Sequence, residues 1–201
     1  MDTVAVQQLG DDLDEFVADV FASLTRAGWQ DRAGHYLRGL MLDGRRKSIQ
    51  PMAAGLAGPH EQALNHFVTN SPWDAAAVRR RLALRMDEAI GPAAWAIDDT
   101  GWLKYGTASV CVARQYTGTA GKVTNCQVGV SLNLVTDTAS CPVDWRLFVP
   151  EAWDEASTCA LPDVAGRRRR AAMPVDVVHR EKWRLGMEMI DEVVGWGCGR
   201  R

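Results

Sequence analysis

Apolar residues in the first part of the chain recur at helical spacing. Between Asp11 and Ala27 they fall three or four positions apart, with acidic residues on the opposite face and in the first turn, which is typical of an amphipathic helix. Turn signals such as Asp43-Gly44 end one helical stretch before the next begins. We therefore expect a compact helical module over residues 1–91. Its further helices are predicted at 31–42, 51–56, 61–68 and 75–90.

The hydrophobic pattern changes from helical spacing to alternation after Gly91-Pro92. Residues 124–135 alternate apolar and polar side chains along their whole length, which is typical of a half-buried antiparallel strand. Shorter apolar runs predict two earlier strands, at 94–98 and 109–116. Because short links join these strands in sequence, we expect an antiparallel meander in a second domain, residues 92–201.

The remainder of the chain combines an irregular segment with one long helix. Prolines interrupt residues 136–174, where only 145–149 has the pattern of a strand. A helix then extends from Val175 to about Val194. We expect its recurring apolar residues to pack on the sheet, which gives an α+β fold class. These residues are Trp183, Met187, Ile190 and Val194.

The overall charge gives no global signal for nucleic acid. Lys and Arg number 23 against 25 Asp and Glu, and the formal net charge is -2. DNA binding would therefore rest on local basic patches, of which the clearest are Arg45–Lys47, Arg79–Arg81 and Arg167–Arg170. Any single patch of this kind is more often a solvated surface than a binding site.

The sequence lacks the signals of membrane and secreted proteins. The N-terminus has no basic start followed by an apolar core, and no apolar run approaches the roughly 20 residues of a membrane helix. The five cysteines form an odd set without a C-x-x-C pair, which favours reduced thiols over a zinc cluster or a disulfide framework. We expect a cytoplasmic protein with no membrane partner.

Two adjacent carboxylates, Asp98 and Asp99, close the first predicted strand. An ionised Asp is rarely buried unless it is paired or bound to a metal. Mg²⁺ prefers a few carboxylate oxygens, completed by water and phosphate. The pair is therefore a candidate site for a divalent cation.

An ordered series of motifs gives the chain a family resemblance. The series consists of D-D-T-G-W-L-K-Y-G at 98–106, V-A-R-Q-Y-T-G-T at 112–119, G-K-V-T-N-C-Q-V at 121–128, W-R-L-F-V-P at 145–150, Trp153 and Lys182-Trp183. Upstream, Y-L-R-G-L at 36–40, R-R-K-S at 45–48 and P-M-A at 51–53 fit the same family. Together they resemble bacterial DDE transposases of the insertion-sequence 701 group. The resemblance implies an N-terminal helical module followed by the first half of a ribonuclease H-like fold, a three-stranded antiparallel meander plus a long helix.

The resemblance also implies phosphodiester chemistry on DNA, in which three carboxylates hold two divalent ions, usually Mg²⁺. The first acid matches Asp98, with Asp99 as an auxiliary catalytic candidate. Because strand side chains alternate between faces, only one of the pair can point at the metals, and we favour Asp98 as the metal ligand. The residues expected to contact DNA are Arg45, Arg46, Lys47, Arg114, Lys122, Arg167, Arg168, Arg169, Arg170 and Lys182.

The end of the sequence departs from the family pattern. In the family, the second catalytic Asp follows the helix that carries the Lys-Trp stretch, and the catalytic Glu comes later. Here only residues 195–201 follow that helix, so we expect a chain truncated before the second Asp and inactive alone. A half-sheet would also leave an uncovered edge, which invites pairing with a second copy or a complementing chain.

The sequence is compatible with three functions. The first is a transposase-like protein that binds the DNA of insertion-sequence ends without strand transfer of its own. The second is one half of a transposase, completed by frameshifting or by a partner. The third is a small enzyme on a transposase remnant, with Asp98 or Asp99 as general acid/base in a pocket lined by tryptophans. The tryptophans in question are Trp95, Trp102, Trp145 and Trp153.

Overall fold

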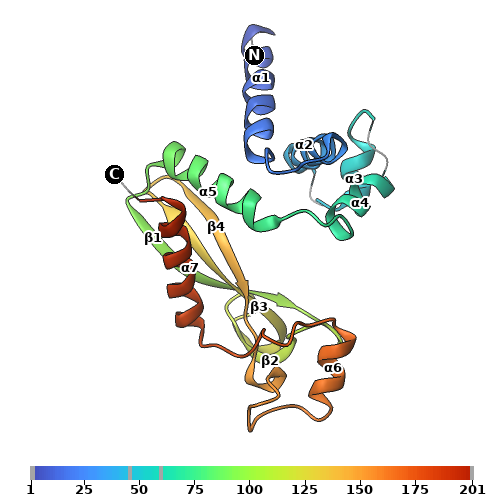
Figure 1. Cartoon of the computed structure of the whole chain (residues 1–201), viewed down its shortest axis with the longest axis vertical. Helices are drawn as coiled ribbons and strands as arrows, with labels where there is room; N and C mark the ends of the chain where they lie inside the picture. The colour runs from blue at the N-terminus through green and yellow to red at the C-terminus, as the bar shows by residue number, and fades with distance from the viewer. Residues whose placement is uncertain (1–2, 45–46, 59–60, 200–201) are drawn as a thin grey trace. The chain divides into compact units, whose positions relative to one another are not determined.

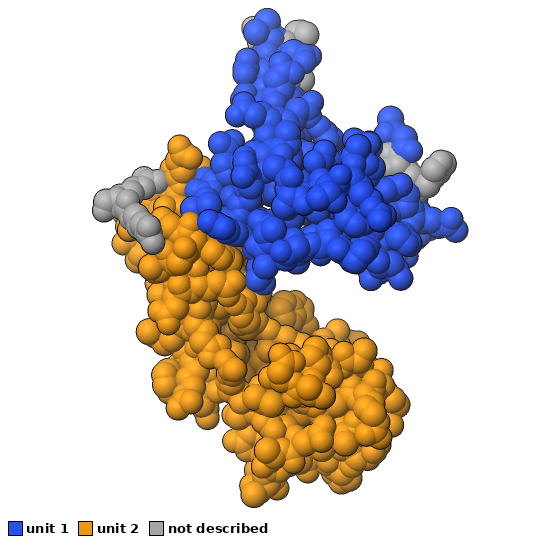
Figure 2. Space-filling view, viewed as in Figure 1, with its two compact units in different colours: residues 1–85 blue, residues 86–201 orange. Residues whose placement is uncertain are grey.

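The computed structural model describes residues 3–44, 47–58 and 61–199. Across these ranges the chain forms seven α-helices, one short 3-10 helix and four β-strands (Figure 1). The expected α+β class is confirmed. Two compact units divide the chain, residues 1–85 and residues 86–201 (Figure 2). The division falls inside α5 (Ala75–Ile90), ahead of the boundary expected at residue 91.

Unit 1 is a helical module with a small aromatic core. Leu24, Ala33 and Phe67 are buried together, and Trp73 stacks on Phe67 with 5.5 Å between the ring centroids. The Trp73 indole N–H donates to the Phe67 carbonyl at 3.0 Å. The module consists of the start of α5 with α1 (Thr3–Val20), α2 (Ala27–Met41), α3 (Ile49–Ala54) and α4 (Glu61–Thr69).

Helix α1 starts at Thr3, ahead of the predicted start at Asp11. Side-chain hydrogen bonds from Gln7 to Asp11 and from Gln8 to Asp12 link successive turns. The hydrophobic pattern could not reveal these turns, because positions 7–12 are exposed and bury no apolar stripe.

Unit 2 is built on an antiparallel sheet with β3 (Lys122–Val135) at its centre. β1 (Ala94–Leu103) pairs with β3 along one edge. β2 (Ala113–Thr117) and β4 (Ser140–Leu147) follow one another along the other edge. β1, β3 and β4 lie side by side as antiparallel strands, with β2 in the link between β1 and β3. The predicted meander, in which the first strand pairs with the second, is therefore wrong. The five residues of β2 are too few to pair along the ten of β1, whereas β3 matches β1 over its full length.

The predicted end of the first strand at Asp98 is also wrong. β1 continues through Thr100 and Gly101 to Leu103, because β3 supplies pairing partners as far as Cys126. The two aspartates therefore lie in the middle of a strand. Gly101 is needed there, since a Cβ at this position would lie 1.9 Å from the Thr117 hydroxyl oxygen.

Helix α7 (Lys182–Trp196) covers one face of the sheet (Figure 1). The alternate β3 residues Val128, Val130, Leu132 and Leu134 are buried. A salt-bridge chain from the buried Asp144 through Arg146 to Glu192 joins β4 to the helix.

The face that α7 turns to the sheet differs from the prediction. Its buried residues are Leu185, Gly186, Met189 and Val193. Trp183, Met187 and Val194 of the predicted stripe are 62%, 50% and 43% exposed. Gly186 explains the difference, because a Cβ there would lie 2.5 Å from Ile97 Cδ1 and the bare backbone lets the helix approach β1. The helix also begins at Lys182 rather than Val175.

The segment expected to be irregular has its own core. Cys111, Val112, Val149 and Trp153 are buried together, and the Trp153 indole N–H donates to the Val112 carbonyl at 2.8 Å. Burial raises the pKa of the Cys111 thiol to about 11, so this group packs as a neutral side chain. The segment includes the 3-10 helix η1 (Glu151–Trp153) and α6 (Val164–Arg170). Of the helices that the structure describes, none is long and apolar enough to span a lipid bilayer.

Candidate metal and nucleic-acid site

Asp98 and Asp99 point to opposite faces of the sheet. Asp98 pairs with Ser131 of β3, and Asp99 pairs with Val130. Val130 belongs to the buried face under α7, so Asp99 faces the helix and Asp98 faces away from it. The two carboxylates therefore cannot share one ion at this strand.

Asp99 is engaged by the start of α7. Its Oδ2 lies 2.6 Å from Lys182 Nζ, and the two side chains are 41% and 37% exposed. The Lys182 ammonium also lies 5.2 Å from the centre of the Phe148 ring. Burial raises the pKa of the Cys126 thiol, and the Lys182 ammonium partly opposes this rise. Lys182, expected to contact DNA, thus contacts Asp99 and fastens α7 to β1.

Asp98 lies on an open face of the sheet, which carries polar side chains of β3 together with the partly exposed Trp102 and Trp145. Its side chain is exposed, and no ion pair of this carboxylate occurs within the described residues. The Asn133 amide donates to the Ser131 hydroxyl at 3.0 Å, and the Trp102 ring lies over Gly129. This carboxylate is available to a cation or to solvent.

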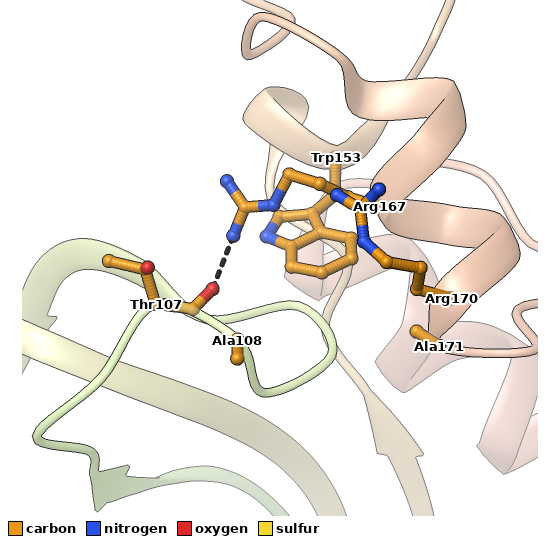
Figure 3. Close-up of a pocket in the computed structure, with 6 residues that line it drawn as sticks. All are labelled: Thr107, Ala108, Trp153, Arg167, Arg170 and Ala171. Carbon is orange, nitrogen blue, oxygen red and sulfur yellow. Dashed lines mark hydrogen bonds between the residues drawn. The ribbon is translucent and has the colours of Figure 1, made fainter.

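The expected DNA-binding residues separate into three structural groups. Arg114 and Lys122 are exposed on β2 and at the start of β3. Arg167 and Arg170 line an open pocket of about 530 Å³ beside Trp153, with Arg169 exposed next to them (Figure 3).

Arg168 is buried, whereas Lys47 is exposed. Arg168 is 5% exposed, and its guanidinium donates to the carbonyls of Trp153, Pro174 and Val177 at 2.8–2.9 Å. Lys47 donates to the Leu42 carbonyl. Arg45 and Arg46 lie outside the described residues.

Comparison with known proteins identifies the family of this chain. Residues 19–200 match the family described as DDE superfamily endonuclease. The chain belongs to this family. It is also 34% identical, over 114 residues, to a protein from Microchaete diplosiphon described as a probable transposase for insertion sequence element IS701. The resemblance to the insertion-sequence 701 group is thereby confirmed. No solved structure matches the chain.

The matched region covers 56% of this chain and 30% of the length of the Microchaete diplosiphon protein. The alignment therefore spans less than a third of that relative.

A divalent metal ion, which DDE endonucleases generally use, has an incomplete set of ligands here. Within the described residues, no three His, Cys, Asp or Glu side chains gather so that they could share an ion. Asp98 offers one carboxylate, and its neighbours Ser131 and Asn133 offer neutral oxygens, which bind Mg²⁺ weakly. The described residues do not fit a two-ion site.

Sequence reasoning missed two structural features near the expected site residues. One is the Asp99–Lys182 pair, whose partners lie 83 positions apart. The other is the pocket wall formed by Thr107 and Ala108, opposite the arginines. For the arginine run, the sequence did contain one signal. Four consecutive arginines on a helix must point in different directions, so they cannot all share one role.

Proposed function

We propose that this chain binds DNA and carries the first acid of a DDE active site, and that it does not cleave or join strands alone. One observation carries the proposal. Asp98 is exposed on the open face of the sheet, whereas Asp99 is engaged by Lys182 on the other face. Each face of β1 thus presents a single acid, while the family chemistry needs three.

The order of elements supports the fold proposed for this site. β1, β3 and β4 lie side by side as antiparallel strands, and α7 follows and packs on them. We propose that unit 2 is the opening half of a ribonuclease H-like fold, with β2 as an addition to the link between β1 and β3. In that arrangement Asp98 stands on the first strand, where the family's first acid belongs.

The proposed DNA contacts are four cations of unit 2 that solvent reaches, Arg114, Lys122, Arg167 and Arg170. Arg114 and Lys122 lie near one end of β3, and Arg167 and Arg170 lie on α6. Arg168 and Lys182 are left out of this set, because the first donates to buried carbonyls and the second to Asp99. Contacts to phosphates release counterions, so the affinity should fall steeply with salt.

The free edge of β1 supports a second proposal, that the active site is completed by another polypeptide. Within the described residues, β1 pairs only with β3, so its other edge is open for a strand. A complementing chain or a second copy pairing there would bring its side chains beside Asp98.

The alternative of a small-molecule enzyme has no support from the structure or the comparisons. Among the described residues, five well-formed pockets are lined by neither Asp98 nor Asp99. Trp153 is 1% exposed and belongs to the core of its segment.

A DNA titration combined with a nicking assay tests the proposed function. We expect a labelled duplex to bind, and the logarithm of its association constant to fall linearly with the logarithm of the salt concentration. The double variant Arg114→Ala/Lys122→Ala should make that slope shallower by about 2, since each phosphate contact contributes about 0.9. Supercoiled plasmid with Mg²⁺ or Mn²⁺ should stay intact.

Asp98→Asn is the control for catalysis, with the exposed Asp137→Asn as a matched loss of charge. Both variants should bind DNA as the wild type does. Salt-independent binding, or none, would refute the DNA-binding part. Metal-dependent nicking by the wild type that Asp98→Asn abolishes would refute the proposed inactivity.

A further inference from the structure

The pocket beside α6 has a cationic lining. It is lined by Thr107 and Ala108 from the loop after β1, by Trp153, and by Arg167, Arg170 and Ala171. Figure 3 shows the Arg167 guanidinium turned toward the Thr107–Ala108 loop. None of these lining residues is acidic, so an anion entering the pocket meets two guanidinium groups.

Arg167 is held in place before any ligand arrives. Its guanidinium carbon lies 4.5 Å from the centre of the Trp153 ring, and one of its nitrogens donates to the Thr107 carbonyl. Trp153 is itself fixed by burial and by its bond to Val112. A guanidinium carries five N–H donors, so most remain for a ligand. Because the side chain is already ordered, little entropy is lost on binding.

Arg170 contributes a second, adjustable cation. Its Nη2 lies 3.1 Å from Asp163 Oδ2. The Arg170 side chain is 68% exposed and the Asp163 side chain is 63% exposed. An exposed pair of this kind contributes about 0–1 kcal/mol. The guanidinium can therefore exchange its partner for a more strongly charged anion.

We propose that this pocket is a phosphate subsite that holds one phosphodiester of a bound DNA strand between Arg167 and Arg170. The planar, forked guanidinium matches phosphate oxygens in pairs. The proposal rests on the proposed function, since DNA is its ligand, and it divides the four-arginine run by role. Arg168 supports the fold, Arg167 and Arg170 hold the phosphate, and Arg169 faces solvent.

The test compares neighbouring arginines that carry the same charge. In a titration with a labelled 20-base-pair duplex, Arg170→Ala should weaken binding about tenfold, the effect of losing one charge-assisted contact. It should also make the salt slope shallower by about 1. Arg169→Ala removes the same charge from the adjacent position of the helix and should weaken binding less than about twofold. Equal losses for the two variants would show a diffuse charge effect and overturn the subsite.

Arg167→Lys tests the fork separately from the charge. It keeps the cation and avoids leaving an empty place over Trp153, so the melting temperature should stay near that of the wild type. We expect about tenfold weaker DNA binding from the loss of the forked geometry. Binding equal to that of the wild type would count against the proposal.

Inorganic phosphate, followed by tryptophan fluorescence at constant ionic strength, distinguishes the source of the phosphate. If Arg170→Ala weakens the binding of free phosphate and leaves DNA binding unchanged, the pocket serves a small anion and the DNA proposal fails. If the wild type binds no DNA, the proposed function and the subsite fail together. If it binds DNA and Arg169→Ala equals Arg170→Ala, only the subsite fails.

Discussion

Arg168 shows how a residue in a charged run can serve the fold. Its guanidinium is 5% exposed and donates to three backbone carbonyls, those of Trp153, Pro174 and Val177. It also lies 3.4 Å from Glu155. These bonds join η1 and α6 to the extended chain that leads into α7. Buried polar groups of this kind are costly to leave without partners.

We expect Arg168→Ala to lower the free energy of unfolding by about 3 kcal/mol, because buried carbonyls lose a charged donor. Urea denaturation followed by tryptophan fluorescence would measure the change. Arg169→Ala is the matched control, since Arg169 is exposed on the same helix, and it should change stability by less than about 0.5 kcal/mol. Equal effects of the two substitutions would contradict the structural role of Arg168.

The sequence indicates which residues are candidates for the site more readily than it indicates where their side chains point. The sequence indicated that Asp98 and Asp99 must point to different faces, and they do so from the middle of β1. It could not indicate that Lys182 would meet Asp99, because that contact forms between positions 83 apart and depends on where α7 begins. The same limit applies to the arginine run, whose charge is visible in the sequence and whose burial at Arg168 is not.

At the scale of elements, α7 carries two apolar stripes and only one is buried. Met189 is 0% exposed, whereas Met187, two positions earlier, is 50% exposed. The spacing of Trp183, Met187 and Val194 predicted the wrong stripe because both are spaced as a helix requires. Close approach at Gly186 selects between them, and the sequence pattern alone does not reveal which glycine faces Ile97.

Alanine substitutions at the two methionines test this assignment. Met189→Ala should cost about 3 kcal/mol of unfolding free energy, since it leaves a cavity against the sheet. Met187→Ala should cost less than about 0.5 kcal/mol, because its side chain is half in solvent already. Chemical denaturation of both variants would measure this. A larger loss for Met187→Ala would restore the originally predicted stripe.

The strand β3 was predictable for a physical reason. Its clean alternation arises because one face packs under α7 and the other remains polar. The pairing of β1 with β3 was not predictable, since the register depends on matching apolar faces across the intervening chain. Length decided the outcome, because only β3 is long enough to pair with all of β1.

At the scale of the whole molecule, β1 and β4, the two outer strands that pair with the same part of β3, differ in protection. β4 contains Pro142, and its pairing with β3 shifts register at Leu132/Asn133. Prolines and register shifts are features that discourage edge pairing. β1 has ten residues, no proline and a regular register. We therefore expect any association through the sheet to use β1.

Sedimentation velocity over a range of protein concentrations tests this expectation. The wild type should form dimers as the concentration rises. Thr100→Lys places a charge in the middle of the β1 edge and should shift the equilibrium toward monomers. Thr119→Lys adds the same charge in the exposed turn between β2 and β3 and should leave the equilibrium unchanged. Monomers at every concentration would refute association through this edge.

The central position of β3 also determines the order in which the sheet can assemble. The short turns at 118–121 and 136–139 bring β2 and β4 to β3 as local hairpins, whereas β1 must close a loop that spans residues 104–121. Closing the longer loop costs more chain entropy, so we expect β1 to join last. Asp98 then takes its place in the sheet only after β2, β3 and β4 have paired. Substitutions in β1 should accordingly speed unfolding more than they slow folding.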